Sequence, residues 1–374
     1  MGFTDRAQVL NRLEQELDAS VLAFVTGDRA GLQTQISADQ LTLFPRHLRY
    51  MGHHERIALL LYTRGGEINA AWPIIGFLRE HCRHLVVLIP FYAHSCGTIL
   101  ALGADEIHMS AYGTLSPVDP TVVNAFNPDN QASPGTKLPI AVEDVLAFLE
   151  LAQEGKADED FAFRLLAKRV HPLALGNVQR SVNQIRQLAQ KMLALHSDPP
   201  GDGTALVMRL TTELYSHQHL VTRREAREMG LPIGPDSAPI ESLLLQYYDH
   251  LCADLQLLDR FDPGSLMRKH AIAYPPQQTP TNLPSVPITI PGTTMAPGVV
   301  PGLPVQPVTQ GVPPLPVRVE RGYIETSGTC DAFVTTGEIT QQVVPQQVIG
   351  MPAGAALHPI VQLTVHTEAW ERQA

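Results

Sequence analysis

The stretch RIALLLYTRGGEINAAWPIIGFLREHCRHLVVLIPFYAHSCGTIL, residues 56–100, decides the fold of this chain. It contains two apolar runs of strand length, RIALLLYT (56–63) and HLVVLIPFYA (84–93), and between them INAAWPIIGFLREHC (68–82) has helical spacing. Strands that are apolar throughout and alternate with helices are typical of a parallel sheet covered on both faces. The stretch therefore predicts an α/β fold.

The same alternation continues on both sides of this stretch. A helical pattern over residues 5–22 precedes a strand in VLAFVTG (21–27), and a helix from Cys96 to Gly103 precedes a short strand in DEIHMS (105–110). Further helices are predicted within residues 142–196, 203–215, 223–229 and 239–258. The α/β pattern thus fills most of the first 265 residues.

The composition changes sharply between Pro275 and Pro316, where thirteen of the 31 prolines fall. Such a segment favours an extended, polyproline-like linker, because proline has no amide hydrogen to donate. After it, residues 317–350 show the β-branched alternation of a small β unit. We predict three parts: an α/β domain (1–265), a Pro-rich linker (266–318) and a small β-rich C-terminal unit (319–374).

Composition also limits the partners and the compartment. The net charge of −10, from 27 basic and 37 acidic residues, argues against a nucleic-acid partner. Four scattered cysteines form no C-x-x-C pair, which favours a reducing cytoplasm and indicates neither a disulfide framework nor a metal site. The longest apolar run, residues 85–93, is too short to cross a bilayer, so we expect no membrane association.

Two features that could take part in catalysis come directly after neighbouring strands. Gly65 and Gly66 come after the first run and Ser95 after the second, and the carboxyl ends of parallel strands meet at one edge of a sheet. Acyl transfer needs a nucleophile, a proton acceptor and donors aimed at the developing oxyanion. We therefore predict Ser95 as the nucleophile, facing the Gly65-Gly66 turn, with the amides of Gly66 and Cys96 as the oxyanion donors.

These residues carry a resemblance to a known family. A T-x-G-G segment, an A-x-S-x-G-T segment, an A-D-E-I-x-M strand and a G-x-x-x-P-x-D-P turn follow one another in this order. The run resembles ClpP/SppA-type serine peptidases, most closely the serine dehydrogenase proteinases, over roughly residues 5–250. The resemblance implies a ClpP/crotonase-like parallel sheet, a crevice for a peptide or protein substrate, assembly into a homo-oligomer, and no cofactor.

The proton acceptor is left open by the sequence. The stretch TLSPVDP (114–120) lacks the histidine that ClpP has there, whereas SppA-like relatives use a serine–lysine dyad. Lys137, the only lysine between Ser95 and the helix near residue 142, is one candidate, and burial would have to lower its pKa. His217 and His219 are the other candidates, because a neutral imidazole accepts a proton at pH 7 without a large shift.

Two other readings compete with a peptidase. The chain could be a weakly active or inactive oligomeric scaffold that presents its Pro-rich region to a partner protein, as the missing ClpP histidine favours. It could also be a crotonase-like acyl-CoA enzyme, but this leaves Ser95 unexplained. Beside the proposed turn, Arg64 is a candidate for binding a substrate carboxylate, with simple surface exposure as the alternative.

Overall fold

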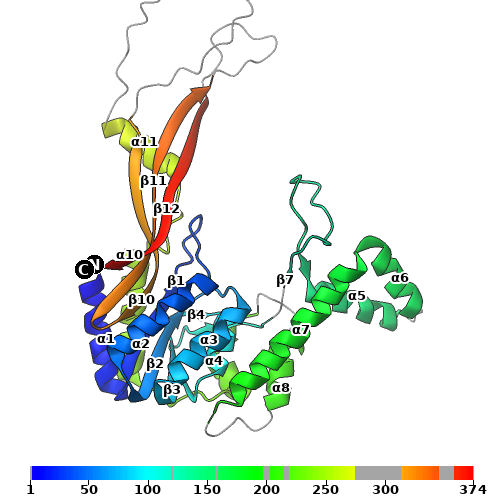
Figure 1. The fold of residues 1–374 in the computed structure, drawn as a ribbon, viewed down its shortest axis with the longest axis horizontal. Coiled ribbons are helices and arrows are strands. Elements are labelled where there is room, and N and C mark those ends of the chain that lie inside the picture. The colour runs from blue at the N-terminus through cyan, green and yellow to red at the C-terminus, as the bar shows by residue number, and fades with distance from the viewer. Residues whose placement is uncertain are drawn as a thin grey trace, which may run out of the picture. The chain divides into compact units, whose positions relative to one another are not determined.

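A mostly parallel sheet lies at the centre of the computed structural model, which describes residues 2–118, 121–155, 159–196, 203–213, 219–273, 313–344 and 358–373. Within these residues, seven strands form one sheet in the order β12-β11-β10-β1-β2-β3-β5 (Figure 1). Their bounds are β1 Ser20–Thr26, β2 His54–Tyr62, β3 Cys82–Ile89, β5 Glu106–Met109, β10 Leu315–Thr326, β11 Thr329–Val344 and β12 His358–Gln373. β1, β2, β3 and β5 pair in parallel, which confirms the predicted α/β fold class.

The strands form a buried core because their side chains are apolar on both faces. On one face Phe24, Leu59 and Val87 are fully buried in a cluster with residues of α2 (Phe44–Met51), α3 (Ile68–Arg79) and α4 (Cys96–Leu102). Each such side chain stabilises the fold by about 1.5–3 kcal/mol. The buried residues of α1 (Phe3–Leu17) and α10 (Ala238–Asp254) lie outside this cluster, and these two helices pack together on the other face (Figure 1).

β10 gives the sheet an antiparallel strand that the sequence did not indicate. It pairs with β1, with Ala23 opposite Glu325 and Thr26 opposite Gly322. Part of the predicted β-rich tail therefore belongs to the central sheet. The predicted linker, 266–318, lies mostly outside the described residues, and its boundaries stay a prediction.

Buried charges fasten β10 to the helices of the core. Arg6, on α1, is 1% exposed and donates through Nε and Nη2 to the two carboxylate oxygens of Glu325, both at 2.9 Å. Nη1 of Arg6 pairs with Asp254 at the end of α10, and the hydroxyl of Tyr247 donates to Glu325 at 2.7 Å. Because Glu325 is fully buried, its charge depends on these partners.

The described chain divides into two compact units. The first comprises the residues up to Arg260 with Glu320–Phe333 and those from Trp370 onward, and it holds every residue of the site described below. The second comprises Phe261–Val319 and Val334–Ala369. The second unit contains α11 (Pro263–Ala273) and parts of β10, β11 and β12. Within it, the hydroxyl of Thr335 donates to Glu368 at 3.1 Å.

A helical region follows β5 in the first unit. Its α7 packs against α4 and buries Val182, Ile185 and Met192. The elements of this region are β7 Thr121–Val122, β8 Ile140–Ala141, α5 Val142–Glu154, α6 Glu159–Arg169, α7 Pro172–Leu193, α8 Gly203–Met208 and the π-helical Arg209–Glu213. No helix in the described ranges is both long and apolar enough to span a bilayer.

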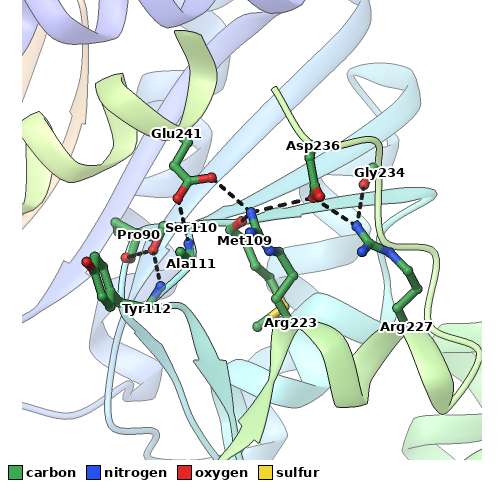
Figure 2. Close-up of polar contacts among 10 residues, drawn as sticks. All are labelled: Pro90, Met109, Ser110, Ala111, Tyr112, Arg223, Arg227, Gly234, Asp236 and Glu241. Atoms are coloured by element: carbon green, nitrogen blue, oxygen red, sulfur yellow. Dashed lines mark hydrogen bonds and ion pairs between the residues drawn. The ribbon is translucent and has the colours of Figure 1, made fainter. Parts of the chain in front are cut away.

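Polar contacts brace the carboxyl edge of the sheet (Figure 2). The hydroxyl of Ser110, just after β5, donates to the carbonyl of Pro90, just after β3, at 2.7 Å. Arg223, which opens α9, donates to the carbonyl of Met109 at 3.2 Å and to Glu241 of α10 at 3.0 Å. The short elements here are η1 Ala38–Thr42, β4 Tyr92–Ala93, β6 Thr114–Leu115, β9 Val221–Thr222 and α9 Arg223–Glu228. These contacts tie the segment after β5 to the end of β3 and to α9 and α10.

Candidate active site

Ser95 lies in a strained turn between β4 and α4. Its backbone has φ 51° and ψ −113°, a positive φ that residues with a side chain rarely adopt. Such strain costs on the order of 1–3 kcal/mol and persists only where surrounding contacts impose it. Here the amide of Ser95 donates to the buried hydroxyl of Ser116 at 2.8 Å, and that hydroxyl donates to the carbonyl of Pro117 at 2.9 Å. A strained serine between a strand and a helix is the arrangement that exposes a nucleophile in many hydrolases.

The Gly65-Gly66 turn contacts Ser95 directly. A methyl group on Gly65 would lie 2.8 Å from Cβ and 3.2 Å from Oγ of Ser95, so only a glycine leaves this space open. The contact follows from the pairing of the two strand ends, in which Thr63 bridges Ala93 in parallel and the amide of His94 donates to the carbonyl of Thr63 at 3.1 Å. The hydroxyl of Ser95, which is half-buried, thus faces the glycine turn.

Both glycines have positive φ, 110° at Gly65 and 147° at Gly66, and the turn is held from behind by Ile36. The amide of Ile36 donates to the carbonyl of Gly65 at 2.9 Å, and its carbonyl accepts from the amide of Glu67 at 2.8 Å. A methyl group on Gly66 would lie only 2.2 Å from the carbonyl oxygen of Ile36. The turn therefore has one conformation, which is what a fixed set of amide donors requires.

Some backbone amides around Ser95 already donate a hydrogen bond within the described part of the chain, and others do not. The amide of Gly65 donates to the hydroxyl of Thr63 at 2.9 Å, and that of Ser95 donates to Ser116. Within the described part of the chain, the amides of Gly66 and Cys96 have no recorded partner. The sequence analysis predicted these two amides as oxyanion donors, and that role stays a prediction.

The thiol of Cys96 does not compete with Ser95 as a nucleophile. Cys96 is fully buried, and its Sγ donates to the carbonyl of Glu67 at 3.3 Å. Burial raises the pKa of this thiol to about 12, so the reactive thiolate is not populated at neutral pH.

Lys137 contacts an acidic residue of its own loop. Its Nζ pairs with Asp129 Oδ1 at 2.8 Å, and the two residues form an isolated antiparallel bridge. Asp129 is 84% exposed, so this ion pair is near solvent and weak. No contact between Lys137 and Ser95 is recorded in the described ranges, and the role of Lys137 stays a prediction.

Of the two candidate histidines, only His219 is among the described residues. His219 pairs through Nε2 with Glu225 Oε1 at 2.9 Å, close to the start of α9, and its side chain is 40% exposed. His217 lies outside the described residues. His94, which precedes Ser95, is buried and shares a 2.9 Å hydrogen bond between Nε2 and the hydroxyl of Thr114.

Sequence reasoning missed two residues that shape the site. The hydroxyl of Ser116 accepts the amide of Ser95, and the hydroxyl of Thr63 accepts the amide of Gly65. Both belong to the motifs already quoted, since Thr63 opens the T-x-G-G segment and Ser116 lies in the turn after β6. As for metals, the described residues contain no group of three or more histidine, cysteine or acidic side chains suited to hold an ion.

Two curated proteins are similar to this chain. The chain is 28% identical over 206 residues to the uncharacterized protein MJ0137 of Methanocaldococcus jannaschii, covering 54% of this chain and 62% of that protein. It is 27% identical over 205 residues to MJ1495 of the same organism, covering 54% and 60%. The chain thus spans about three fifths of the length of the curated relatives it matches.

Two solved structures similar to this chain are variants of the 1510-N membrane-bound stomatin-specific protease. One has 17% sequence identity and a TM-score of 0.33, covering 54% of this chain and 76% of the other. The second, in complex with a substrate peptide, has 18% identity and a TM-score of 0.32, covering 54% and 74%.

A family model matches residues in the first half of the chain. Residues 5–167 match the family described as ClpP-like SDH-type serine proteinase. The matched range includes the Gly65-Gly66 turn and Ser95. The candidate site thus lies within the segment that is similar to the ClpP-like, SDH-type serine proteinases.

Proposed function

We propose that the chain is a serine peptidase that cleaves peptide bonds through an acyl-enzyme on Ser95. The observation that carries the proposal is the contact between Ser95 and the glycine turn, in which the strained serine faces Gly65 with two unused amides nearby. The serine proteinase family of residues 5–167 supports the same chemistry. A protein that used the fold only as a scaffold would gain nothing from the strain at Ser95.

In this mechanism, Oγ of Ser95 attacks the carbonyl carbon of the scissile bond and gives its proton to a base. The amides of Gly66 and Cys96 donate to the oxyanion of the tetrahedral intermediate, where each donor of this kind is worth on the order of 10²–10³ in rate. The carbon–nitrogen bond then breaks, and the base returns the proton to the leaving amine. Water attacks the ester in a second round of the same steps and releases Ser95.

A fluorophosphonate probe tests the nucleophile, because it forms a covalent bond with an activated serine. We expect labelling of the wild-type chain and none of Ser95→Ala. Ser133→Ala, which removes an exposed loop serine, is the matched control and should label as wild type does. Absence of labelling in the wild type would refute the proposal and favour the scaffold, which light scattering would then examine as a homo-oligomer.

The base is the open part of this mechanism, and the same labelling assay distinguishes the candidates. If Lys137 is the base, Lys137→Ala reduces the rate of labelling by at least ~10²-fold, while Asp129→Asn, which removes its ion-pair partner, does not. If an imidazole is the base, His217→Ala or His219→Ala has the dominant effect. A loss confined to one of these variants identifies the group.

A further inference from the structure

Arg64 lies between the end of β2 and the glycine turn, and its side chain is held on one edge by Asp28. Its Nε donates to Asp28 Oδ2 at 2.7 Å. The other carboxylate oxygen of Asp28 accepts from the hydroxyl of Tyr62 at 2.6 Å. Both oxygens of this largely buried carboxylate, which is 13% exposed, are therefore used in fixing two neighbouring side chains of the strand end.

The same guanidinium lies over an aromatic ring. Cζ of Arg64 lies 3.6 Å from the ring centroid of Tyr92, close enough for a cation–π interaction. Tyr92 is three residues before Ser95, and its ring also contacts Tyr62 at 5.9 Å between centroids and Phe91 at 4.3 Å. The position of the guanidinium is thus set by elements that also position Ser95.

The outer edge of the guanidinium is left for another molecule. The side chain of Arg64 remains 45% exposed, and its terminal nitrogens have no recorded partner in the part of the chain that the structure describes. Arg6 differs, because it uses all three nitrogens on buried carboxylates. The two terminal nitrogens of Arg64 are therefore available to a ligand.

The charge and shape of the Arg64 guanidinium indicate which ligand group it would bind. A guanidinium fork binds a carboxylate through two parallel hydrogen bonds, and a fork already fixed in position loses little entropy when it does so. Arg64 is also the residue directly before Gly65, which contacts Ser95. We propose that Arg64 is a specificity-determining residue that binds a carboxylate of the peptide substrate near the scissile bond.

This inference rests on the proposed peptidase function and adds a substrate class to it. A peptide carboxylate has two sources, an aspartate or glutamate side chain and the C-terminal α-carboxylate. A half-exposed charge-assisted pair of this kind corresponds to a preference of about tenfold in kcat/KM over the matching amide. The amide is the proper comparison because glutamine has the size of glutamate without its charge.

The test uses full-length protein and synthetic decapeptides in matched pairs, with cleavage followed by mass spectrometry. One set carries glutamate or glutamine at each position and an amidated C-terminus. A second set is neutral and has a free or an amidated C-terminus. A fluorophosphonate without charged groups, applied to every variant, measures the reactivity of Ser95 independently of substrate charge.

We expect the wild type to prefer the carboxylate member of one set by about tenfold, which identifies the source. Arg64→Gln removes the preference, and Arg64→Glu reverses it toward the uncharged member of the same pair, while fluorophosphonate labelling stays within about threefold of wild type. Arg224→Gln, which changes an exposed arginine on α9, is the matched control and keeps the preference.

The inference is overturned by cleavage without any charge preference, or by a preference that survives in Arg64→Gln. It is also overturned if Arg64→Gln slows fluorophosphonate labelling as much as it slows every peptide, because Arg64 then acts by holding the glycine turn. In these cases Ser95-dependent labelling of the wild type leaves the peptidase proposal standing. If the wild type neither labels nor cleaves, both proposals fail together.

Discussion

Replacing Gly65 by alanine gives the sharpest test of the contact between the glycine turn and Ser95. The added methyl group would lie 2.8 Å from Cβ of Ser95, which is 0.6 Å less than the 3.4 Å at which ordinary contacts begin. It would also lie 3.0 Å from the carbonyl oxygen of His94. Because the second neighbour is backbone, the serine turn itself has to move.

The size of the effect follows from this displacement. A misplacement of about 1 Å near the chemistry costs on the order of 10²-fold in rate, so a shift of at least 0.6 Å predicts a loss of about 10- to 10²-fold in labelling of Ser95. The positive φ of 110° adds roughly 1–2 kcal/mol of strain, which lowers the free energy of unfolding.

Alanine variants of two other glycines distinguish the effect of backbone strain from that of the steric clash. Gly52 has φ 86° and nothing within 4 Å of the position of a methyl group, so Gly52→Ala adds the backbone strain without the steric clash. Gly76, inside α3, has open space and an ordinary helical backbone, so Gly76→Ala adds neither. The assays are the rate of fluorophosphonate labelling and unfolding by urea, measured on all three variants.

We expect both Gly65→Ala and Gly52→Ala to lose stability, Gly65→Ala by more because its steric clash adds to the backbone strain, and only Gly65→Ala to lose labelling. Gly76→Ala should be as stable as wild type or slightly more so, because alanine is the better helix former. If Gly65→Ala is destabilised like Gly52→Ala but labels at the wild-type rate, the glycine turn does not face the reactive serine.

Three further predictions concern the surroundings of the site. Cys96→Ala keeps labelling within about threefold of wild type, because its buried thiol, with a pKa raised to about 12, takes no part; abolished labelling would contradict this. Arg6→Met lowers the free energy of unfolding by about 3–5 kcal/mol, since Glu325 then lies buried without its cation, and urea unfolding of the double variant with Glu325→Gln should show partial recovery. The hydrogen bond from His108 holds the pKa of Glu106 at about 2, below its ordinary value of 4.5, so this carboxylate stabilises the fold above about pH 4.5 and the contribution is lost as the pH falls toward 2. Thermal unfolding of Glu106→Gln should therefore differ from wild type at pH 7 and approach it near pH 2; an equal difference at both would argue against the shift.

The parallel part of the fold could be predicted from the sequence because its signal is local. The runs at 56–63 and 84–93 are apolar over a strand length, and their carboxyl ends meet because parallel neighbours share one edge. The same local logic led to the pairing of Ser95 with Gly65, whose contact the structure describes.

The antiparallel strand could not be predicted, because its partner is nearly 300 residues away along the chain. Nothing in the pattern of residues 315–326 distinguishes a strand that pairs with β1 from one in a separate unit. Likewise, a glutamate at 325 in an alternating strand reads as solvent-exposed, whereas it is fully buried against Arg6. Long-range charge pairs of this kind leave no periodic signal.

The position of the proton acceptor was equally beyond local reasoning. Lys137 lies in a loop rich in proline and asparagine, where the direction of a side chain depends on tertiary contacts. Ser116 illustrates a related limit. The sequence shows a serine at this position, but it does not show that the hydroxyl accepts a hydrogen bond from the amide of Ser95.

The pairing of β10 with β1 has a consequence for how this protein is made. Glu325, whose carboxylate neutralises Arg6, leaves the ribosome 319 residues after Arg6 does. During that interval the sheet edge at β1 is unpaired, and the one carboxylate of this buried set that can reach Arg6 is Asp254, once α10 has been made. Synthesis of the C-terminal strands is thus the step that completes the N-terminal half, and a nascent chain halted before position 325 should be a client for chaperones.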